Sequence, residues 1–349
     1  MSASRGRRLL AAAIGFAMAA LLFELVLRQV YWLPAADDPV FGNIALPGAT
    51  VRVRTEGGGT SRWTERGIRR ASPPAPAPAP ILALGDSFTE ALMIDDEDVF
   101  TNRLEGLLVE AGRPIPVWNA GRSGLSAADY VADAPAYQKA FAPRWVVIEL
   151  RDDDLAAEAW DPGISHFARA PDGRLEAVSV RPRLGRFHAL LQPLRQRSAL
   201  VNYGMVRARE FAAAAAREAP LFRANAPAAA DGSGAPQDAS QYPIGEELEA
   251  MQRAYGGRVT FLYLPHFDLA APATPTSTAE RVFRERCERG AWSCVDLRAA
   301  FPAFAARHES PVGISNSAGN QGHMNAAGHH AAALLLRDEM LRLSDRGLL

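Results

Sequence analysis

A serine and a histidine that lie far apart in the chain are the residues best suited to covalent chemistry. Ser87 follows an apolar run and a Gly-Asp pair in the stretch "ILALGDSFTE". A serine hydroxyl is a weak nucleophile unless a base takes its proton, and histidine is the commonest base. Of the seven histidines, His323 stands in a polar loop, "GNQGHMNAAGHH", that enters the last predicted helix. A Ser87–His323 pair would support acyl transfer, whereas the alternative for Ser87 is a helix N-cap.

These two residues need a scaffold that brings distant segments together. Apolar runs at 81–84, 115–121, 144–150, 258–266 and 292–297 are separated by helical patterns, among them 99–111, 127–141 and 325–343. Such runs predict parallel strands covered on both faces and joined by right-handed crossovers. The predicted fold is therefore α/β, a doubly wound, flavodoxin-like sheet of five parallel strands with helices on both faces. Ligands of such sheets bind at the carboxyl ends of the strands, where Ser87 is expected.

The other histidines are weaker candidates for a base. His329 and His330 fall inside the last predicted helix and are expected to pack in the core or lie on the surface. His266 follows the fourth predicted strand and so lies at the correct sheet edge, but nothing around it indicates a role.

The N-terminus has the composition of a membrane anchor. Nineteen apolar residues, Leu9 to Leu27 with Glu24 as the only charge, follow three arginines and precede Tyr31 and Trp32. At helical rise they cover roughly 28 Å, about the thickness of a bilayer core. The arginines predict a cytoplasmic N-terminus, a single span in the inner membrane and a periplasmic remainder. A cleaved signal peptide and a buried helix of a soluble protein are the alternatives.

Three regions are expected, and the first of them, residues 1–32, is the cytoplasmic tip with the membrane anchor. Residues 33–80 form an irregular or short-stranded lead-in that ends in a stiff linker, "SPPAPAPAP". Residues 81–349 form the α/β domain, with an insert at 156–242 that contains two predicted helices and a loop-like segment, "ANAPAAADGSGAPQDAS". Such an insert is typically a lid or faces a partner.

Composition excludes several classes of protein. With 349 residues, 48% of them hydrophobic, the chain can bury a large core, and a net charge of −1 gives no support for nucleic-acid binding. No Cys/His cluster has zinc-ligand spacing. The two cysteines, Cys287 and Cys294, are either a disulfide, if the domain lies in an oxidising compartment, or two small buried thiols.

Three motifs resemble the SGNH (GDSL-type) hydrolase superfamily. They are "LGDSFTE" after the first strand, "NAGRSG" after the second, and "HMNAAGH" at the start of the last helix. The resemblance covers about 81–155 and 244–345 and implies Ser87 as the nucleophile, His323 as the base and the Gly121 N–H as an oxyanion donor. The anchor and the "RGIRR" lead-in also resemble extracytoplasmic members linked to polysaccharide or lipid modification.

The chain departs from the family pattern at two positions. Asp153, in "ELRDDDL", stands where the family has an asparagine that donates to the oxyanion, and a carboxylate there would repel the developing charge. Asn320, three residues before His323, stands where the family has an aspartate that orients the histidine. Three readings follow: a slow Ser87–His323 dyad, a histidine oriented by another carboxylate such as Asp152 or Asp154, or a site that has lost catalysis and kept binding.

The expected function is that of a serine ester hydrolase or O-acyltransferase that acts outside the membrane on an acylated glycan or lipid. Neither reaction requires a metal or an organic cofactor. The alternative is an accessory protein that binds glycan during envelope polysaccharide assembly. A nucleotide- or flavin-binding domain is disfavoured, because no glycine-rich phosphate loop follows the first strand. Protein partners are not indicated.

Overall fold

A computed structural model describes most of the chain. The described residues are 2–38, 40–70, 79–155, 158–160, 164–180, 186–218, 242–290, 292–314, 316–317 and 322–349.

The main sheet has five parallel strands, as the sequence predicts. They are β6 (Ile81–Leu84), β7 (Val117–Asn119), β8 (Trp145–Leu150), β11 (Val259–Tyr263) and β12 (Ser293–Asp296), in the order β12-β11-β8-β6-β7. The first strand in the chain, β6, therefore has the second, β7, on one side and the third, β8, on the other. This reversal of strand order is the point where doubly wound sheets bind ligands.

Helices cover both faces of this sheet. They are α3 (Phe100–Glu110), α4 (Ala127–Ala132), α5 (Ala134–Phe141), α9 (Ile244–Ala254), α10 (Thr278–Gly290), α11 (Phe301–Ala306) and α12 (Ala326–Asp345). Alternate strand residues face opposite sides. Leu82 and Ile148 pack in a cluster with α4, α5, α9 and α10, whereas Ile81 and Val147 pack with α3, α11 and α12. The expected coverage of both faces is confirmed.

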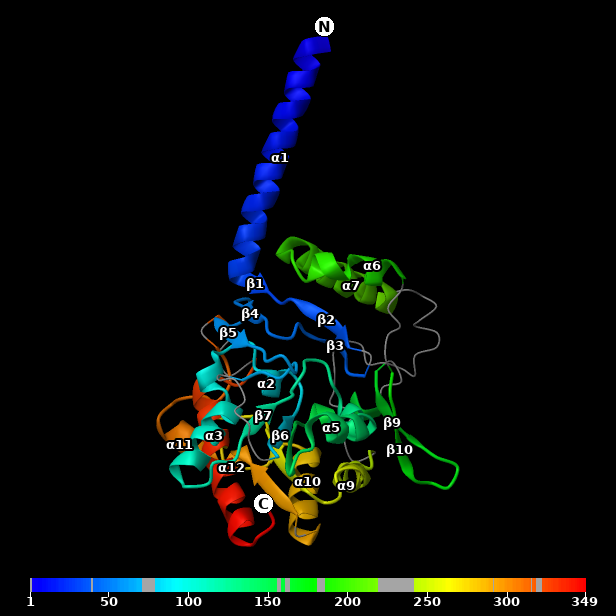
Figure 1. Cartoon of the computed structure of the whole chain (residues 1–349). Coiled ribbons are helices and arrows are strands. Elements are labelled where there is room, and N and C mark those ends of the chain that lie inside the picture. The colour runs from blue at the N-terminus through cyan, green and yellow to red at the C-terminus, as the bar shows by residue number, and fades with distance from the viewer. Residues whose placement is uncertain are drawn as a thin grey trace.

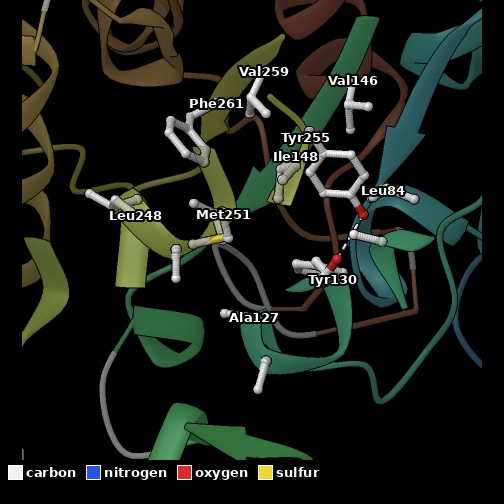
Figure 2. Packing of buried hydrophobic residues seen from close by; sticks show 14 of the residues in the cluster. Leu84, Ala127, Tyr130, Val146, Ile148, Leu248, Met251, Tyr255, Val259 and Phe261 are labelled. Carbon is white, nitrogen blue, oxygen red and sulfur yellow. Dashed lines mark hydrogen bonds between the residues drawn. The ribbon is translucent and has the colours of Figure 1, made fainter. Parts of the chain in front are cut away.

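The helix expected at 127–141 is two helices, which corrects the sequence-based prediction. The chain bends at Asp133, and Pro135 lies in the first turn of α5. Proline cannot continue a preceding helix, because it lacks the N–H and its ring meets the carbonyl one turn earlier. The two pieces keep their apolar residues in the same core cluster. Figure 2 shows the part of this cluster around Ala127 and Tyr130 of α4. There the hydroxyl of Tyr255 donates to the Tyr130 carbonyl at 2.7 Å.

The lead-in folds into short strands. After the long helix α1 (Ser2–Val30) come a three-stranded antiparallel sheet, β1 (Tyr31–Trp32), β4 (Thr50–Val53) and β5 (Gly59–Arg62), and a hairpin, β2 (Ala35–Asp38) and β3 (Gly42–Ala45). This sheet lies against the α/β domain, between it and α1 (Figure 1). Residues 72–78 of the Pro/Ala linker lie outside the described residues, and the predicted boundary between 80 and 81 stays a prediction.

The insert contains the two predicted helices and an unpredicted hairpin. The helices are α6 (Arg186–Arg195) and α7 (Ala199–Glu218), and the hairpin is β9 (His166–Arg169) with β10 (Leu175–Val178). Short 3-10 helices occur at Asp96–Asp98, Asp153–Leu155, Glu158–Trp160 and Leu297–Ala300. The loop-like segment 224–240 falls outside the described part of the chain. Cys287 of α10 and Cys294 of β12 form a disulfide, the first of the two readings of these cysteines.

Candidate active site

Ser87 is the first residue of α2 (Ser87–Glu90), directly after β6 and the Gly85-Asp86 turn. A side chain at Gly85 would place its Cβ 2.6 Å from Glu149 Oε2, so the turn needs glycine. The N-cap of α2 is Asp86, whose Oδ1 accepts the Phe88 N–H at 2.7 Å. The alternative in which Ser87 serves as the cap is therefore wrong, and its hydroxyl points elsewhere.

That hydroxyl meets His323. The Ser87 Oγ lies 2.8 Å from His323 Nε2, within hydrogen-bond reach, although the two residues are 236 positions apart. Hydrogen bonds of His323 itself and of Asn325 hold the histidine in this position. The Gly313 N–H donates to the His323 carbonyl at 2.9 Å, and Asn325 caps α12 by accepting two backbone N–H groups with Oδ1. The expected proximity of serine and histidine is present in the structure.

The third residue of the site is Glu56, which the sequence analysis missed. Its Oε2 lies 2.6 Å from His323 Nδ1, and its Oε1 accepts the backbone N–H of His323 at 2.9 Å. A carboxylate at Nδ1 fixes the tautomer in which Nε2 can accept a proton, and it stabilises the imidazolium that forms. Ser87, His323 and Glu56 thus form a nucleophile–base–acid series with the geometry of a catalytic triad.

Glu56 reaches the site from the turn between β4 and β5. Three glycines follow it, and two of them lie against the loop after α2. A Cβ at Gly59 would be 2.5 Å from the Ile94 carbonyl oxygen, and Gly57 has a φ of +70° that favours glycine. Gly322, at φ +90°, leaves room for the Glu56 carboxylate. Any other residue at this position would place its Cβ 2.5 Å from Glu56 Oε1.

Arg69 fastens this lead-in sheet to the nucleophile helix. It is fully buried, and its Nε donates to Asp96 Oδ1 at 2.8 Å. Its terminal nitrogens donate to the carbonyls of Glu90, the last residue of α2, and of Ala91 and Ile94 after it. Burial lowers the pKa of the guanidinium and the Asp96 carboxylate raises it, yet arginine stays charged in proteins. The "RGIRR" motif therefore has a structural role within the domain, as the link between Glu56 and Ser87.

The carboxylates considered in the sequence analysis do not reach His323. Asp152 Oδ1 accepts hydrogen bonds from the hydroxyls of Tyr263 and Ser277, and Asp154 accepts the Arg151 N–H at 2.8 Å. Asn320 lies outside the described residues, and Glu56 occupies the Nδ1 position that was assigned to it. Of the three readings, the geometry fits the one in which a carboxylate elsewhere orients the histidine, and that carboxylate is Glu56 instead of Asp152 or Asp154.

The two residues expected at the oxyanion, Gly121 and Asp153, have other contacts in this structure, and their role stays a prediction. The Gly121 N–H donates to Asn119 Oδ1 at 2.9 Å, so it is already bonded within the chain. A Cβ there would lie 2.6 Å from the Glu90 nitrogen, which shows that Gly121 is needed for close packing against α2. The Asp153 side chain is 60% exposed and lies 3.7 Å from Arg151. Its charge is therefore hydrated and partly neutralised.

A buried carboxyl group lies beneath the nucleophile turn. Glu149, at the end of β8, is fully buried, and its Oε2 accepts the Thr89 hydroxyl at 3.2 Å. Burial, and then the neighbouring charges of Asp86 and Asp154, raise the pKa of Glu149 well above its ordinary value. Burial thus favours the neutral form of this carboxyl group beneath Ser87.

A pocket of about 480 Å³ opens beside the triad. Its walls include Phe88 and Gly322, the immediate neighbours of Ser87 and His323. The remaining lining combines apolar and polar side chains, namely Leu264, Pro265, Phe267, Leu297, Phe301, Val312 and Met324 with Arg151, Asp152, Asp153 and His266. The volume lies in the range of small-ligand sites. The Arg151 guanidinium carbon lies 4.1 Å from the centre of the Phe88 ring, which places a positive charge over the residue that follows the nucleophile in the chain.

The other histidines have the roles expected for non-catalytic residues. His329 is buried and stacks on Phe100, and burial lowers its pKa to about 3. His330 is exposed on α12, and His266 is exposed at the mouth of the pocket. Among the described residues, no group of three or more His, Cys, Asp or Glu side chains has the arrangement of a metal site.

Comparisons with known proteins give structural similarity alone. No family model and no curated protein matches the chain. Solved structures that match include TesA, with 17% identity, a TM-score of 0.38 and coverage of 75% of this chain and 98% of that one. They also include a variant of Axe2, an acetylxylan esterase from Geobacillus stearothermophilus, with 15% identity, a TM-score of 0.41 and coverage of 76% and 94%.

A third match is a two-domain esterase active on acetylated mannans, with 14% identity and a TM-score of 0.39. That match covers 75% of this chain and 49% of the other. Similarities of this size do not assign an activity, so the assignment must come from the geometry of Ser87, His323 and Glu56.

Proposed function

We propose that this chain is a membrane-anchored serine esterase of the SGNH type that uses a Ser87–His323–Glu56 triad. The observation that carries the proposal is the unbroken hydrogen-bonded series from the Ser87 hydroxyl through both ring nitrogens of His323 to the Glu56 carboxylate. An inactive binding protein has no need for a carboxylate at Nδ1. The glycines around Glu56 preserve that contact at positions where other residues would clash or be strained.

The reaction follows from the positions of these groups. Ser87 Oγ attacks the ester carbonyl carbon while His323 Nε2 takes the hydroxyl proton, and Glu56 stabilises the resulting imidazolium. The tetrahedral intermediate collapses, and the alcohol leaves with the proton from His323. An acceptor hydroxyl then attacks the acyl-serine with His323 again as the base. Water as acceptor gives hydrolysis, and a sugar hydroxyl gives O-acyl transfer.

The Arg151 guanidinium supports the charge that develops in this reaction. It lies on the Phe88 ring beside Ser87 and pairs with the Asp153 carboxylate at 3.7 Å. Positive charge near an oxyanion stabilises the transition state, and here it offsets the loss of the family's asparagine. The backbone N–H of Ser87, at the start of α2, is the second group, after Arg151, that we expect to stabilise the oxyanion.

The substrate and location are inferred from the pocket and the N-terminus. The apolar side chains of the pocket fit an acyl group, and its open, polar mouth fits a glycan or lipid headgroup. The helix at Gly6–Val30 is long and apolar enough to cross a membrane, with a mean hydropathy of 2.3. The arginines at its N-terminal end, Arg5, Arg7 and Arg8, favour an N-terminus in the cytoplasm and a catalytic domain in the periplasm. The Cys287–Cys294 disulfide supports that oxidising compartment.

Turnover of chromogenic esters tests the proposal. Purified protein is assayed with p-nitrophenyl esters of increasing acyl length, alongside Ser87→Ala and His323→Ala variants. His330→Ala is the matched control, because His330 is exposed on α12. We expect activity to disappear in the first two variants and to persist in the control. Equal turnover by Ser87→Ala and the parent would refute the assignment, and glycan binding without turnover would favour the accessory-protein alternative.

A further inference from the structure

The α6–α7 hairpin of the insert lies at the end of the molecule from which α1 projects (Figure 1). The esterase reaction uses no residue of this hairpin. Its position beside the apolar helix suggests a role at the membrane.

The hairpin is bonded directly to α1. The carboxylate of Glu24 accepts the Ser198 hydroxyl at 2.9 Å and the backbone N–H groups of Ala199 and Leu200 at 2.9 and 2.7 Å. Glu24 thereby caps the N-terminus of α7. Arg28, which pairs with Glu24 at 2.7 Å, also donates to the Arg197 carbonyl. Glu24 lies about 9 Å from the end of α1 at helical rise, so α7 begins at the depth of the last turns of that helix.

One side of the hairpin is bound to the segment that follows α1. On α6, the Gln192 side chain donates to the Ala35 carbonyl at 3.0 Å. On α7, the Asn202 side chain donates to the Leu33 carbonyl at 2.6 Å. These two polar contacts mark the inner faces of the helices.

The outer faces are apolar. On α6, Leu190 and Leu194 are each two residues from Gln192, which is a rotation of about 200° and places them on the opposite face of the helix. On α7, Phe211 is nine residues from Asn202, which leaves it rotated by about 180°, also on the opposite face. All three are highly exposed, at 73%, 51% and 78%. Single exposed apolar residues are ordinary on protein surfaces. Each of the three lies about half a turn from a polar contact with residues 33–35, on a hairpin whose start is bonded to α1, and the apolar side chains of α1 are exposed as well.

We propose that the α6–α7 hairpin lies in the surface of the membrane that α1 spans. The outer apolar residues Leu190, Leu194 and Phe211 enter the boundary between headgroups and acyl chains, as those of interfacial helices do. Exposed Arg197 and Arg207 suit anionic headgroups. The inference rests on the membrane anchoring by α1, and it gives the domain a second attachment that fixes its orientation on the bilayer.

Depth-dependent fluorescence quenching tests this inference on the full chain in lipid vesicles. Single-cysteine variants Leu194→Cys and Phe211→Cys carry an environment-sensitive fluorophore, and the native cysteines are held in the disulfide. Leu348→Cys is the matched control, because Leu348 is 53% exposed and lies near the C-terminus, at the end of the molecule opposite α1 (Figure 1). Circular dichroism confirms that each labelled variant is folded.

Spin-labelled lipid should quench the probes at 194 and 211 several-fold more than the probe at 348, and aqueous iodide should do the reverse. Equal quenching at the three positions would overturn the inference. Release of the protein by alkaline carbonate would also overturn it, since α1 would then not span the bilayer. The readout does not depend on ester turnover, so failure of the proposed enzymatic function would be seen separately.

Discussion

Replacing Glu56 by glutamine removes the charge from the site and keeps the shape of the side chain. The amide oxygen can still accept one hydrogen bond from His323, but it does not stabilise the imidazolium that forms when Nε2 takes the serine proton. The Oε2–Nδ1 distance of 2.6 Å makes this a close ion pair in the protonated state.

The expected loss follows from that geometry. Unit charges roughly 4 Å apart at an effective dielectric constant of about 20 interact by about 4 kcal/mol, which corresponds to about 10³ in rate. The analogous change in the serine protease template costs about 10⁴, for a fully buried aspartate. The Glu56 side chain is 24% exposed, so water screens part of its charge. We therefore expect kcat to fall by about 10²- to 10³-fold.

Steady-state hydrolysis of a p-nitrophenyl ester measures this loss. KM should change little, because Glu56 is not part of the pocket wall. Glu65→Gln, the same substitution at an exposed position of the lead-in, is the control and should keep full activity. A Glu56→Gln enzyme that is folded and within about threefold of the parent in kcat would refute the triad, since it would show that no charge is needed at Nδ1.

Further substitutions test the support of the site. Arg69→Met should destabilise the domain by about 3–5 kcal/mol, because buried Asp96 loses its partner at 2.8 Å and keeps only the exposed Arg62 at 3.7 Å, and thermal melts should show no such loss for exposed Arg54→Met. Burial raises the pKa of Glu247 from 4.5 to about 8. Between pH 4.5 and about 8 the side chain is therefore neutral in the folded state and ionised in the unfolded state. Stability therefore falls as pH rises through this window, and Glu247→Gln should raise the Tm at pH 9 and little at pH 4; a constant difference would contradict this. Asp153→Asn should change kcat by less than about threefold, because the carboxylate is exposed and paired, whereas a large gain would place it at the oxyanion. Arg151→Met should lower kcat by about 10- to 100-fold with intact folding, and unchanged kcat would remove it from the mechanism.

The main sheet could be predicted from the sequence because four of its five strands are buried along their whole length. Short apolar runs such as 81–84 and 144–150, with glycine, proline and polar residues at their ends, indicate buried strands. The same reasoning failed at 127–141, where apolar periodicity continues across a break that Pro135 imposes. The β9–β10 hairpin was missed because its strands are short, exposed on one side and rich in charge.

The serine and the histidine were predictable because each stands at the end of a recognisable element. Glu56 was not, because it comes from a polar, glycine-rich turn 267 residues from its partner, and nothing local indicates such a contact. The one indication was the run "EGGG" itself, a carboxylate followed by residues that permit close backbone approach. The oxyanion role of Gly121 stays a prediction, because a glycine needed for packing against α2 has the same sequence pattern as an oxyanion donor.

Covalent labelling by a fluorophosphonate tests the activated serine most directly. The reagent reacts with a hydroxyl only when a base and an oxyanion site are in place. Mass spectrometry should find one adduct per chain, on the peptide that contains Ser87, with labelling strongly slowed in Glu56→Gln and abolished in His323→Ala. An unlabelled Ser87 in folded protein, or labelling that is as fast without His323 as with it, would contradict the triad.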